Sequence, residues 1–585
     1  MTQKLDTEVI IVGAGPVGLL MANILAEKKV RIRILVQTSL SVDTLKEPVS
    51  QWKACAIHSR TQEMFARHNL TEVSRKDSTA TSRMNVVDNG RITRMRLAVV
   101  PTEFPGILLI EQNITERNLT KALSDRYSIS IERGWTLQEF EKDASISGPI
   151  LSQWTDPKGQ TVTLVSSYLI GCDGARSVTR KTMDMPFVGK AVPTLMAVAD
   201  VTVSSTTLPQ PEEAHSFTHP DGMLIYLPFR DPSRVRVVIA MSLPDGTDPD
   251  APLPPDAIVT KETFSETFRK RMKPFEMGDL TLEDVRPFRV NERRAAHFSD
   301  PSSRVFLCGD SAHVHSPVGG QGMNIGLQDA ENLAWKLITV LRGHAPPSLL
   351  DTYTHERAPI ADHAIGMSGR LLQMMSLRGW IASFARRILT FMLTTIPMLN
   401  FNAALNISQL ANKYAPESLR VRGNEVAKGH STILKNPGGW VKPGQRAPEA
   451  RVWSMPGVQP GRILEYLGST WSIVLFVCEA REWKSHLPEL DQLATRYRIG
   501  RIPLFIVAPT NLAFIQPDAH PGVHVLFDLK SPRAREAWGL GSHPKAEVVF
   551  LVRPDGVIAS ASPLAVARET LQTALDDVLY TRNDL

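Results

Sequence analysis

The chain has 585 residues, enough for about three or four domains of roughly 150 residues each. Hydrophobic residues make up 43% and charged residues 22% of it, which is typical of a folded globular protein and excludes a disordered, collagenous or coiled-coil chain. The net charge is only +6, and the basic pairs at Arg293 and Arg386 are short and isolated. We therefore expect no nucleic-acid partner.

Cysteine spacing and hydropathy further restrict the class of protein to which the chain can belong. The four cysteines lie far apart without a CxxC pair, so we expect reduced thiols and no zinc site. The uncharged run from Val9 to Ala26 contains a glycine turn and lacks a basic leader, so it indicates a buried strand and helix, not a signal peptide or membrane span. A shorter apolar run from Ile388 to Leu399 predicts a buried or surface-docked helix. We expect a cytoplasmic protein without a membrane span.

The chain opens with a strand, a glycine turn, a helix and a second strand. The strands are expected over 8–12 and 31–36, and the turn has the sequence GAGPVG. In a dinucleotide-binding unit Gly13 permits the tight turn, Gly15 lets the backbone approach a pyrophosphate, and Gly18 lets helix and strand pack closely. The phosphates would lie at the helix N-terminus, where free N–H groups favour an anion. A glycine turn in another α/β fold is the alternative.

The end of the second strand departs from this fingerprint. An acidic residue that binds the ribose hydroxyls is expected there, but the position holds Val36, followed by Gln37. Gln37 can both donate and accept hydrogen bonds, so we predict that it substitutes at the adenosine ribose.

The middle of the chain combines short helical signals with β patterns. A helix is expected to begin near Arg60, and Thr115 with Glu116 form a plausible capping pair before another helix. A strand over 162–172 ends in DGARS. Alternating runs at 223–229 and 235–241 predict a mostly β subdomain.

A second glycine-rich loop follows a buried strand. The strand is expected over 304–308, and after it come GDSAH and SPVGGQGMN, which end at Asn324. Apolar residues then recur at helical spacing from Leu327 to Leu341. A polar, glycine-rich loop between a buried strand and a helix predicts a second anion or cofactor cradle.

Helical patterns continue to about residue 414, and the composition changes after that. Residues 416–440 are rich in Gly, Pro, Lys and Arg and predict a linker. Strands expected over 471–477, 504–508 and 547–552, with a closing helix over 564–578, predict a separate α/β module.

Three motifs together resemble the group A flavoprotein monooxygenases, the FAD-dependent aromatic hydroxylases. They are GAGPVG from Gly13, CDGARS from Cys172 and CGDSAHVHSPVGGQGMN from Cys308. The phenol-hydroxylase-like members, which carry a thioredoxin-like C-terminal domain, are the most similar, and the RPDG turn at Arg553 agrees with them.

The resemblance implies an α/β fold in which a Rossmann-like FAD-binding domain is interleaved with a mostly β substrate domain, followed by a C-terminal thioredoxin-like α/β domain. The implied FAD-binding part is 1–415, with the substrate subdomain at about 76–110 and 185–295. The linker is then 416–440, and the thioredoxin-like domain without CxxC is 441–585.

The resemblance also implies which residues bind the cofactors. Asp173 and Arg176 would serve both FAD and NAD(P)H, and Lys53 would lie near the pyrophosphate in place of the usual Arg. Gln112 and Asp310 would reach the flavin side chain. The other implied FAD ligands are Gly13, Gly15, Gly18, Gln37, Gly320, Gly322, Met323 and Asn324. The alternative for Asp173 and Asp310 is a turn aspartate that caps local backbone. His313 and His315 lack a third ligand, so we predict no metal.

The implied activity is that of an FAD-dependent, NADPH- or NADH-consuming monooxygenase. It would insert one oxygen from O2 into an aromatic or polyketide-like small molecule through a flavin C4a-hydroperoxide, most simply by phenolic ring hydroxylation. Pro317 would lie near the flavin edge. Candidates for the group that activates the substrate are His58, His219, Tyr226 and Arg289, each of which also has a structural interpretation. Cys55 stands where phenol hydroxylase has an acidic residue, which argues against simple phenol as substrate.

Several alternatives stay open at this point. The same fold performs Baeyer–Villiger oxidation, epoxidation and dearomatising hydroxylation, and an FAD oxidase or halogenase is a further enzyme hypothesis. A non-enzymatic carrier is disfavoured because Gln112, Asp173 and Asp310 would serve only a flavin. Cys478 is a single thiol, for which we expect a structural role or a contact in a homodimer.

Overall fold

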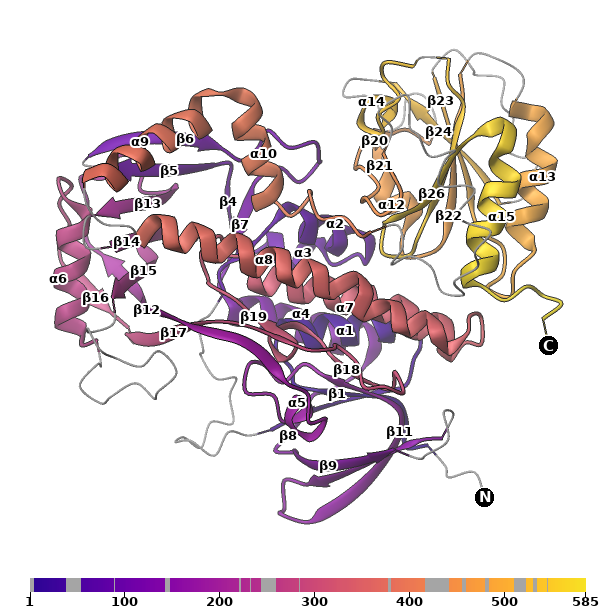
Figure 1. The fold of residues 1–585 in the computed structure, drawn as a ribbon, viewed down its shortest axis with the longest axis horizontal. Coiled ribbons are helices and arrows are strands. Elements are labelled where there is room, and N and C mark those ends of the chain that lie inside the picture. The colour runs from indigo at the N-terminus through magenta and orange to yellow at the C-terminus, as the bar shows by residue number, and fades with distance from the viewer. Residues whose placement is uncertain are drawn as a thin grey trace.

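A computed structural model gives the fold, with elements labelled as in Figure 1. It describes residues 5–37, 54–88, 90–142, 148–219, 222–231, 233–242, 259–283, 285–376, 380–415, 441–454, 459–478, 483–509, 522–529, 534–543 and 545–584. Lys53 and the predicted linker 416–440 lie outside the described residues.

The first strand of the N-terminal strand–turn–helix unit lies inside a seven-stranded sheet. The strand order is β8-β2-β1-β11-β10-β9, with β18 beside β11. The pairs among β8, β2, β1, β11 and β18 are parallel, whereas β9, β10 and β11 are antiparallel. The strands are β1 (Thr7–Val12), β2 (Ile32–Val36), β8 (Glu132–Arg133), β9 (Thr136–Lys142), β10 (Ile150–Thr155), β11 (Thr161–Gly171) and β18 (Val305–Leu307). Their core packs against α1 (Pro16–Glu27), α4 (Gln112–Tyr127) and α7 (Gly322–Leu341).

A nine-stranded sheet is assembled from two separate parts of the chain. Its order is β19-β17-β12-β15-β14-β13-β5-β6, with β16 beside β12. The first part supplies β5 (Arg83–Asp88) and β6 (Arg91–Arg96). The second supplies β12 (Phe187–Val203), β13 (Ala214–His219), β14 (Gly222–Pro228), β15 (Arg234–Ser242), β16 (Leu280–Leu282), β17 (Arg286–Ala295) and β19 (His313–Val314).

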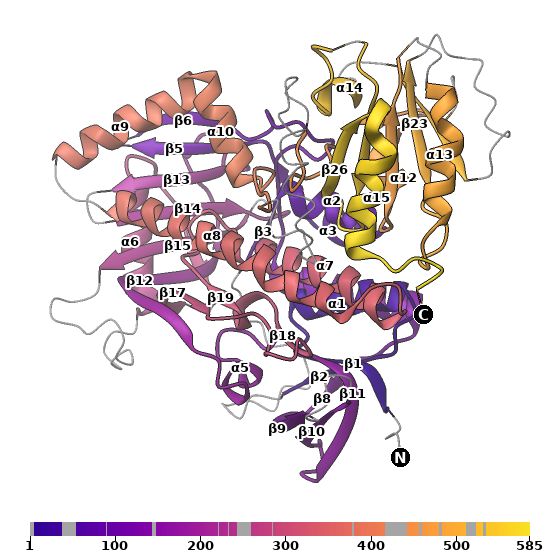
Figure 2. The ribbon, with the colours of Figure 1, turned by 45° about the vertical axis from the view of Figure 1, so that its right-hand side comes forward.

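Helices cover both faces of this sheet. On one face, Phe264 and Phe268 of α6 (Lys261–Met272) pack among the alternating apolar residues of the strands. On the other face, Leu372 of the long helix α8 (Thr352–Ser376) packs with Met196 of β12. Both ribbon views show α8 running from the nine-stranded sheet towards the seven-stranded one (Figures 1 and 2).

The C-terminal part forms its own five-stranded sheet of order β24-β23-β22-β25-β26. The strands β22 (Ser472–Phe476), β23 (Leu504–Pro509) and β24 (Val523–Asp528) are parallel, and β25 (Val548–Val552) and β26 (Ile558–Pro563) are antiparallel. One face packs on α13 (Trp483–Thr495) and α15 (Ala567–Val578), and the other on α12 (Ile463–Leu467) and α14 (Ala534–Ala537). Trp471, just before β22, meets Trp335 of α7 edge-on, with ring centroids 5.8 Å apart.

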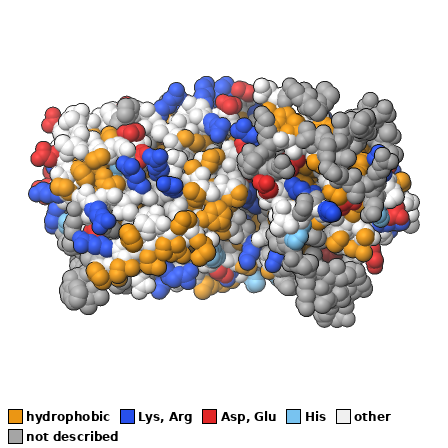
Figure 3. All heavy atoms as spheres, turned by 90° about the horizontal axis from the view of Figure 1, so that it is seen from above, with side chains coloured by type: hydrophobic (Ala, Val, Ile, Leu, Met, Phe, Trp, Pro, Cys, Tyr) orange, Lys and Arg blue, Asp and Glu red, His pale blue; other side chains and the backbone are white. Residues whose placement is uncertain are grey.

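Short elements and two surface helices complete the fold. Helices α9 (Trp380–Thr395) and α10 (Pro397–Ile407) lie against β6, at the top of Figure 1, and hydrophobic side chains gather on this side when it is viewed from above (Figure 3). No single helix within the described ranges is long and apolar enough to cross a membrane. The remaining elements are β3 (Ala56–Ile57), β4 (Thr79–Thr81), β7 (Ile107–Leu109), β20 (Arg451–Val452), β21 (Gly461–Arg462), α2 (Ser59–Arg67), α3 (Thr71–Arg75) and α5 (Val178–Thr182).

Most elements expected from the sequence are present, with three differences. Helix α4 begins at Gln112 with Glu111 as its N-cap, so Thr115 and Glu116 lie within the helix and the predicted capping pair is wrong. Strand β24 was not anticipated. The apolar run expected as one helix from Ile388 is broken at Ile396, because Pro397 has no N–H to continue α9 and instead starts α10. The domain boundaries given above stay predictions.

Candidate functional site

The three motifs meet at the carboxyl edge of the parallel strands. Val12 at the end of β1 pairs with Gly171 of β11, and Gly171 pairs with Leu307 of β18. The chain segments that follow these strands, which contain Gly13, Asp173 and Asp310, therefore emerge side by side. In open parallel sheets this edge is where ligands bind.

The first glycine turn has the shape of a phosphate cradle. Gly13 has a φ of 104°, and a Cβ on Gly18 would lie 2.1 Å from the carbonyl oxygen of Gly13, so both positions need glycine. Gly15 differs, because a Cβ placed there meets nothing within 4 Å. It is the N-cap of α1 and offers no side chain to the first N–H groups. The space above Gly15 and these N–H groups fit the pyrophosphate of FAD.

The second loop presents one acidic group and anchors another. The Asp310 carboxylate is half-buried and has no hydrogen-bond partner within the described part of the chain, as expected of a group that accepts from a ribityl hydroxyl. Asp329 of α7 fixes the loop behind it. Its carboxylate accepts from the Gly309 N–H at 3.1 Å, from His313 Nε2 at 2.7 Å and from Arg357 Nε of α8 at 2.7 Å. Burial opposes ionisation, but Arg357 and His313 hold the pKa of Asp329 below its usual range.

The loop over 316–324 is joined to β3 by two side chains. Asn324 Nδ2 donates to the carbonyls of Ala56, at 2.9 Å, and Gly320, at 3.1 Å. Asn324 Oδ1 accepts from the His58 N–H at 2.9 Å, and His58 Nε2 donates to the Gly320 carbonyl at 3.0 Å. Burial lowers the pKa of His58 to about 4, so its ring is neutral at physiological pH. His58 is thus placed to position the loop, and this geometry does not support its prediction as a catalytic base.

The other predicted cofactor residues are placed in different ways. Gln112 joins two elements, because its Oε1 accepts from the Ala54 N–H at 3.0 Å and its Nε2 donates to Glu116 at 2.8 Å. The Asp173 carboxylate accepts from Ser177 Oγ at 2.6 Å and from the Thr179 N–H at 2.9 Å, which is the local capping expected of a turn aspartate. Arg176 and Gln37 are exposed at the same edge of the sheet.

Of the remaining catalytic candidates, only Pro317 lies at the loop. Its carbonyl accepts from the Gly320 N–H at 2.9 Å. Tyr226 is fully buried on the α6 face, edge-on to His215, and burial raises its pKa to about 12. Arg289 pairs with Leu195, which packs on that same face. Because neighbouring residues of a strand point to opposite faces, both side chains point away from the loop, and their predicted catalytic roles are not supported.

The part of the sheet face next to Val318 of the loop is apolar. Met196, Met223, Ala240 and Val290 pack with Val318 of the loop and with Leu372 of α8. Half-buried Ile225 and Phe288 join this cluster, and Ile225 also contacts a second cluster, at Cys55 and Ala56.

Sequence reasoning missed the buried charges that hold the site together. Arg236 of β15 forms a bidentate ion pair with Asp200 of β12, at 2.8 and 2.9 Å, and donates to the Ala54 carbonyl beside Cys55. Burial raises the pKa of the Cys55 thiol, so it is uncharged. Arg180 of α5 donates to the Ser311 carbonyl at 2.9 Å and ties the third motif to the second. The only sign of these buried ion pairs in the sequence is that charged residues interrupt apolar runs.

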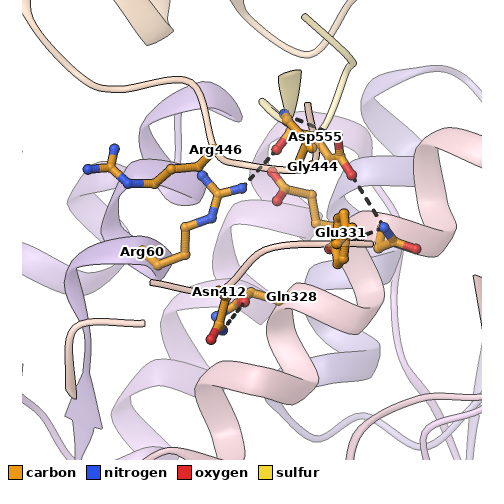
Figure 4. A pocket seen from close by; sticks show the side chains of 10 residues that line it. Arg60, Gln328, Glu331, Asn412, Gly444, Arg446 and Asp555 are labelled. Atoms are coloured by element: carbon orange, nitrogen blue, oxygen red, sulfur yellow. Dashed lines mark hydrogen bonds between the residues drawn. The ribbon is translucent and has the colours of Figure 1, made fainter. Parts of the chain in front are cut away.

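A separate polar pocket lies where the C-terminal module meets α2, α7 and the chain near Tyr414 (Figure 4). Arg553 donates to Glu356 of α8 at 2.8 and 2.9 Å and also pairs with Asp555, and Arg446 pairs with Glu63 of α2 at 2.9 Å. These ion pairs link the C-terminal module to α2 and α8, so the pocket is a junction between modules, and none of its lining residues belongs to the glycine-rich loops. No cluster of metal-ligating side chains occurs among the described residues.

Known proteins resemble the chain over most of its length. Residues 6–368 match the family described as FAD binding domain. The chain is 30% identical over 429 residues to 6-methylpretetramide 4-monooxygenase of Streptomyces rimosus, which covers 72% of each chain.

Solved structures extend the likeness to the whole fold. OxyS anhydrotetracycline hydroxylase from Streptomyces rimosus matches with a TM-score of 0.68 at 23% identity, covering 98% of this chain and 99% of that one. A ternary complex of aklavinone-11 hydroxylase with FAD and aklavinone matches with a TM-score of 0.69, the same identity and the same coverage. The predicted fold class is confirmed, whereas the thioredoxin-like assignment of the C-terminal module stays a prediction. The chain belongs to the FAD-binding domain family, within its FAD-dependent monooxygenases.

Proposed function

We propose that the protein hydroxylates the ring of a phenolic, polyketide-like molecule, with FAD as cofactor and NADPH or NADH as reductant. The balanced reaction converts the substrate C–H bond, O2, the reduced nicotinamide and a proton into C–OH, the oxidised nicotinamide and water. FAD, when bound, takes electrons from the nicotinamide and activates O2. The apolar cluster around Val318 carries the proposal, because it places buried hydrocarbon side chains next to the loop over 316–324.

The chain's own residues supply binding and orientation. Gly15 and the N-terminus of α1 would hold the pyrophosphate, and Asp310 would accept from the ribityl chain. The backbone at Gly322, Met323 and Asn324 would face the pyrimidine edge, with His58 and Asn324 fixing the loop. Exposed Arg176 would meet the transiently bound nicotinamide cosubstrate.

The proposed substrate is larger than phenol. Cys55 is uncharged and packs in the same cluster as Met84 and Ile225, so it offers no acidic group that could activate a small phenol. An extended aromatic system gains its binding energy from apolar area, at roughly 25 cal/mol per Å². The names 6-methylpretetramide 4-monooxygenase and anhydrotetracycline hydroxylase agree with a polycyclic substrate, whereas the relative pentachlorophenol 4-monooxygenase is named for a single-ring phenol.

The test follows nicotinamide oxidation by purified, FAD-loaded protein across a panel of polycyclic and single-ring phenols. We expect polycyclic phenols to accelerate NADPH or NADH loss and to yield a product heavier by one oxygen. If only single-ring phenols accelerate nicotinamide oxidation, the proposal of a polycyclic substrate is refuted. If nicotinamide oxidation accelerates without an oxygenated product, the proposal of hydroxylation is refuted.

We also propose a cytoplasmic location. Cys55, Cys172, Cys308 and Cys478 are all free thiols, which fits a reducing compartment.

A further inference from the structure

Helices α9 and α10 carry an apolar face that points outward. Phe384, Ile388, Phe391 and Met392 recur at the spacing of one helical face and are all exposed, with Phe384 at 61%. After the break, Met398 of α10 is 68% exposed. An amphipathic helix of a globular protein normally turns this stripe towards the core, whereas here it is an exposed apolar surface among the residues that the structure describes.

The surroundings of this face are basic. Neither helix contains Asp or Glu, and neither does the edge strand β6 beside them. Along β6, Arg91, Arg94 and Arg96 are exposed, and Arg387 of α9 is exposed and pairs with Asp88. Viewed from above, Lys and Arg side chains lie around the hydrophobic ones (Figure 3).

The geometry suits a flat surface. The segments Phe384–Thr395 and Pro397–Ile407 are bent by 93° relative to each other, so they form an L and not one straight rod. Apolar side chains with a basic rim are the pattern by which amphipathic helices lie in the interface of anionic membranes. A symmetric contact with a second copy would instead bring the two basic rims together, at a cost in repulsion.

We propose that α9 and α10 dock the protein on an anionic lipid surface. The opposite side of α10 faces the protein. There Ala403 and Ile407 pack on the cluster of Cys55 and Ala56, which forms one wall of the proposed substrate site. Gln409, just after α10, hydrogen-bonds Gln328 of α7 at 2.5 Å. Docking would hold this wall at the lipid interface, where apolar aromatic molecules dissolve; that consequence rests on the proposed function, whereas docking itself does not.

Vesicle sedimentation of the full chain tests the proposal. Vesicles of phosphatidylcholine mixed with phosphatidylglycerol should carry down about tenfold more protein than phosphatidylcholine alone, and raised salt should weaken the binding. The variant F384N/I388N/M398N should lose most of this binding. Val188→Asn is the matched control, because Val188 is 64% exposed on β12, away from the helices, and its change should leave binding intact. Arg91→Gln with Arg96→Gln should remove the preference for the anionic lipid.

Three results would overturn the proposal. Wild-type protein could remain in the supernatant with anionic vesicles, or the triple variant could bind as well as Val188→Asn. Alternatively, light scattering could show a wild-type dimer that the triple variant dissociates, which would assign the face to a second copy. Vesicle binding without any substrate-stimulated NADPH oxidation would contradict the proposed function and leave the docking surface standing.

Discussion

Substituting two glycines of the same turn by alanine separates cofactor binding from folding. Gly15 has φ −71° and ψ 177°, a conformation open to alanine, and its Cβ would meet no protein atom within 4 Å. Alanine at this N-cap costs up to about 1 kcal/mol, offset by about 0.4–1 kcal/mol of lost chain entropy in the unfolded state. The free energy of unfolding of the flavin-free Gly15→Ala protein should therefore lie within about 1 kcal/mol of the wild-type value. The new methyl group would occupy the pyrophosphate space, so we expect FAD affinity to fall about 100-fold, equivalent to about 2.7 kcal/mol.

Gly18→Ala is the contrasting variant. Its Cβ would lie 2.1 Å from the Gly13 carbonyl and 3.2 Å from Cys172 Cβ, so the turn must move, at a cost of about 1–3 kcal/mol or more. The assays are FAD fluorescence titration and urea unfolding of flavin-free protein. Wild-type FAD affinity in Gly15→Ala, or a loss of stability in Gly15→Ala equal to that in Gly18→Ala, would refute the cradle at Gly15.

Three further predictions address the buried groups. Asp329→Asn leaves the Arg357 guanidinium buried beside a neutral amide and should lower the free energy of unfolding by about 3–5 kcal/mol; a loss below about 1 kcal/mol in urea would contradict the anchoring role. Tyr226→Phe, on the α6 face, should leave the pH profile of substrate-stimulated turnover unchanged, and a lost basic limb would show that the hydroxyl acts on substrate. Burial and Glu63 raise the pKa of Glu449 from 4.5 to about 8, so the folded state holds a proton that the unfolded state releases, and stability should fall as pH rises from about 4.5 to about 8. Glu449→Gln should flatten that fall, which is worth at most about 4–5 kcal/mol, and an unchanged profile would refute this titration.

Local patterns in the sequence were sufficient to predict the elements at the carboxyl edge of the parallel strands. The strand ending at Val12, the turn at Gly13 and the helix to Glu27 form as expected, because each depends on neighbouring residues and on backbone geometry that only glycine permits. The loop after Leu307 was found for the same reason. Its predicted role as a cofactor cradle rests on its place between a buried strand and a helix.

Side-chain partners distant in sequence could not be predicted. Asp329 and Arg357 look like isolated charges in two helices, and only the packing of α7 on α8 brings them together. Tyr226 is one residue from Ile225, so a strand register that a pattern cannot fix decides which of the two faces the loop. The outward apolar face of α9 and α10 is likewise set by tertiary packing, because the same spacing indicates a core helix in most chains.

In the proposed function, the site transfers one oxygen atom from O2 to an aromatic ring. FAD-loaded protein, NADPH and an accepted polycyclic phenol under ¹⁸O₂ give the direct measurement. We expect one ¹⁸O atom in each molecule of hydroxylated product. A product that carries oxygen from water, or NADPH oxidation that yields only hydrogen peroxide with every accepted phenol, would contradict it.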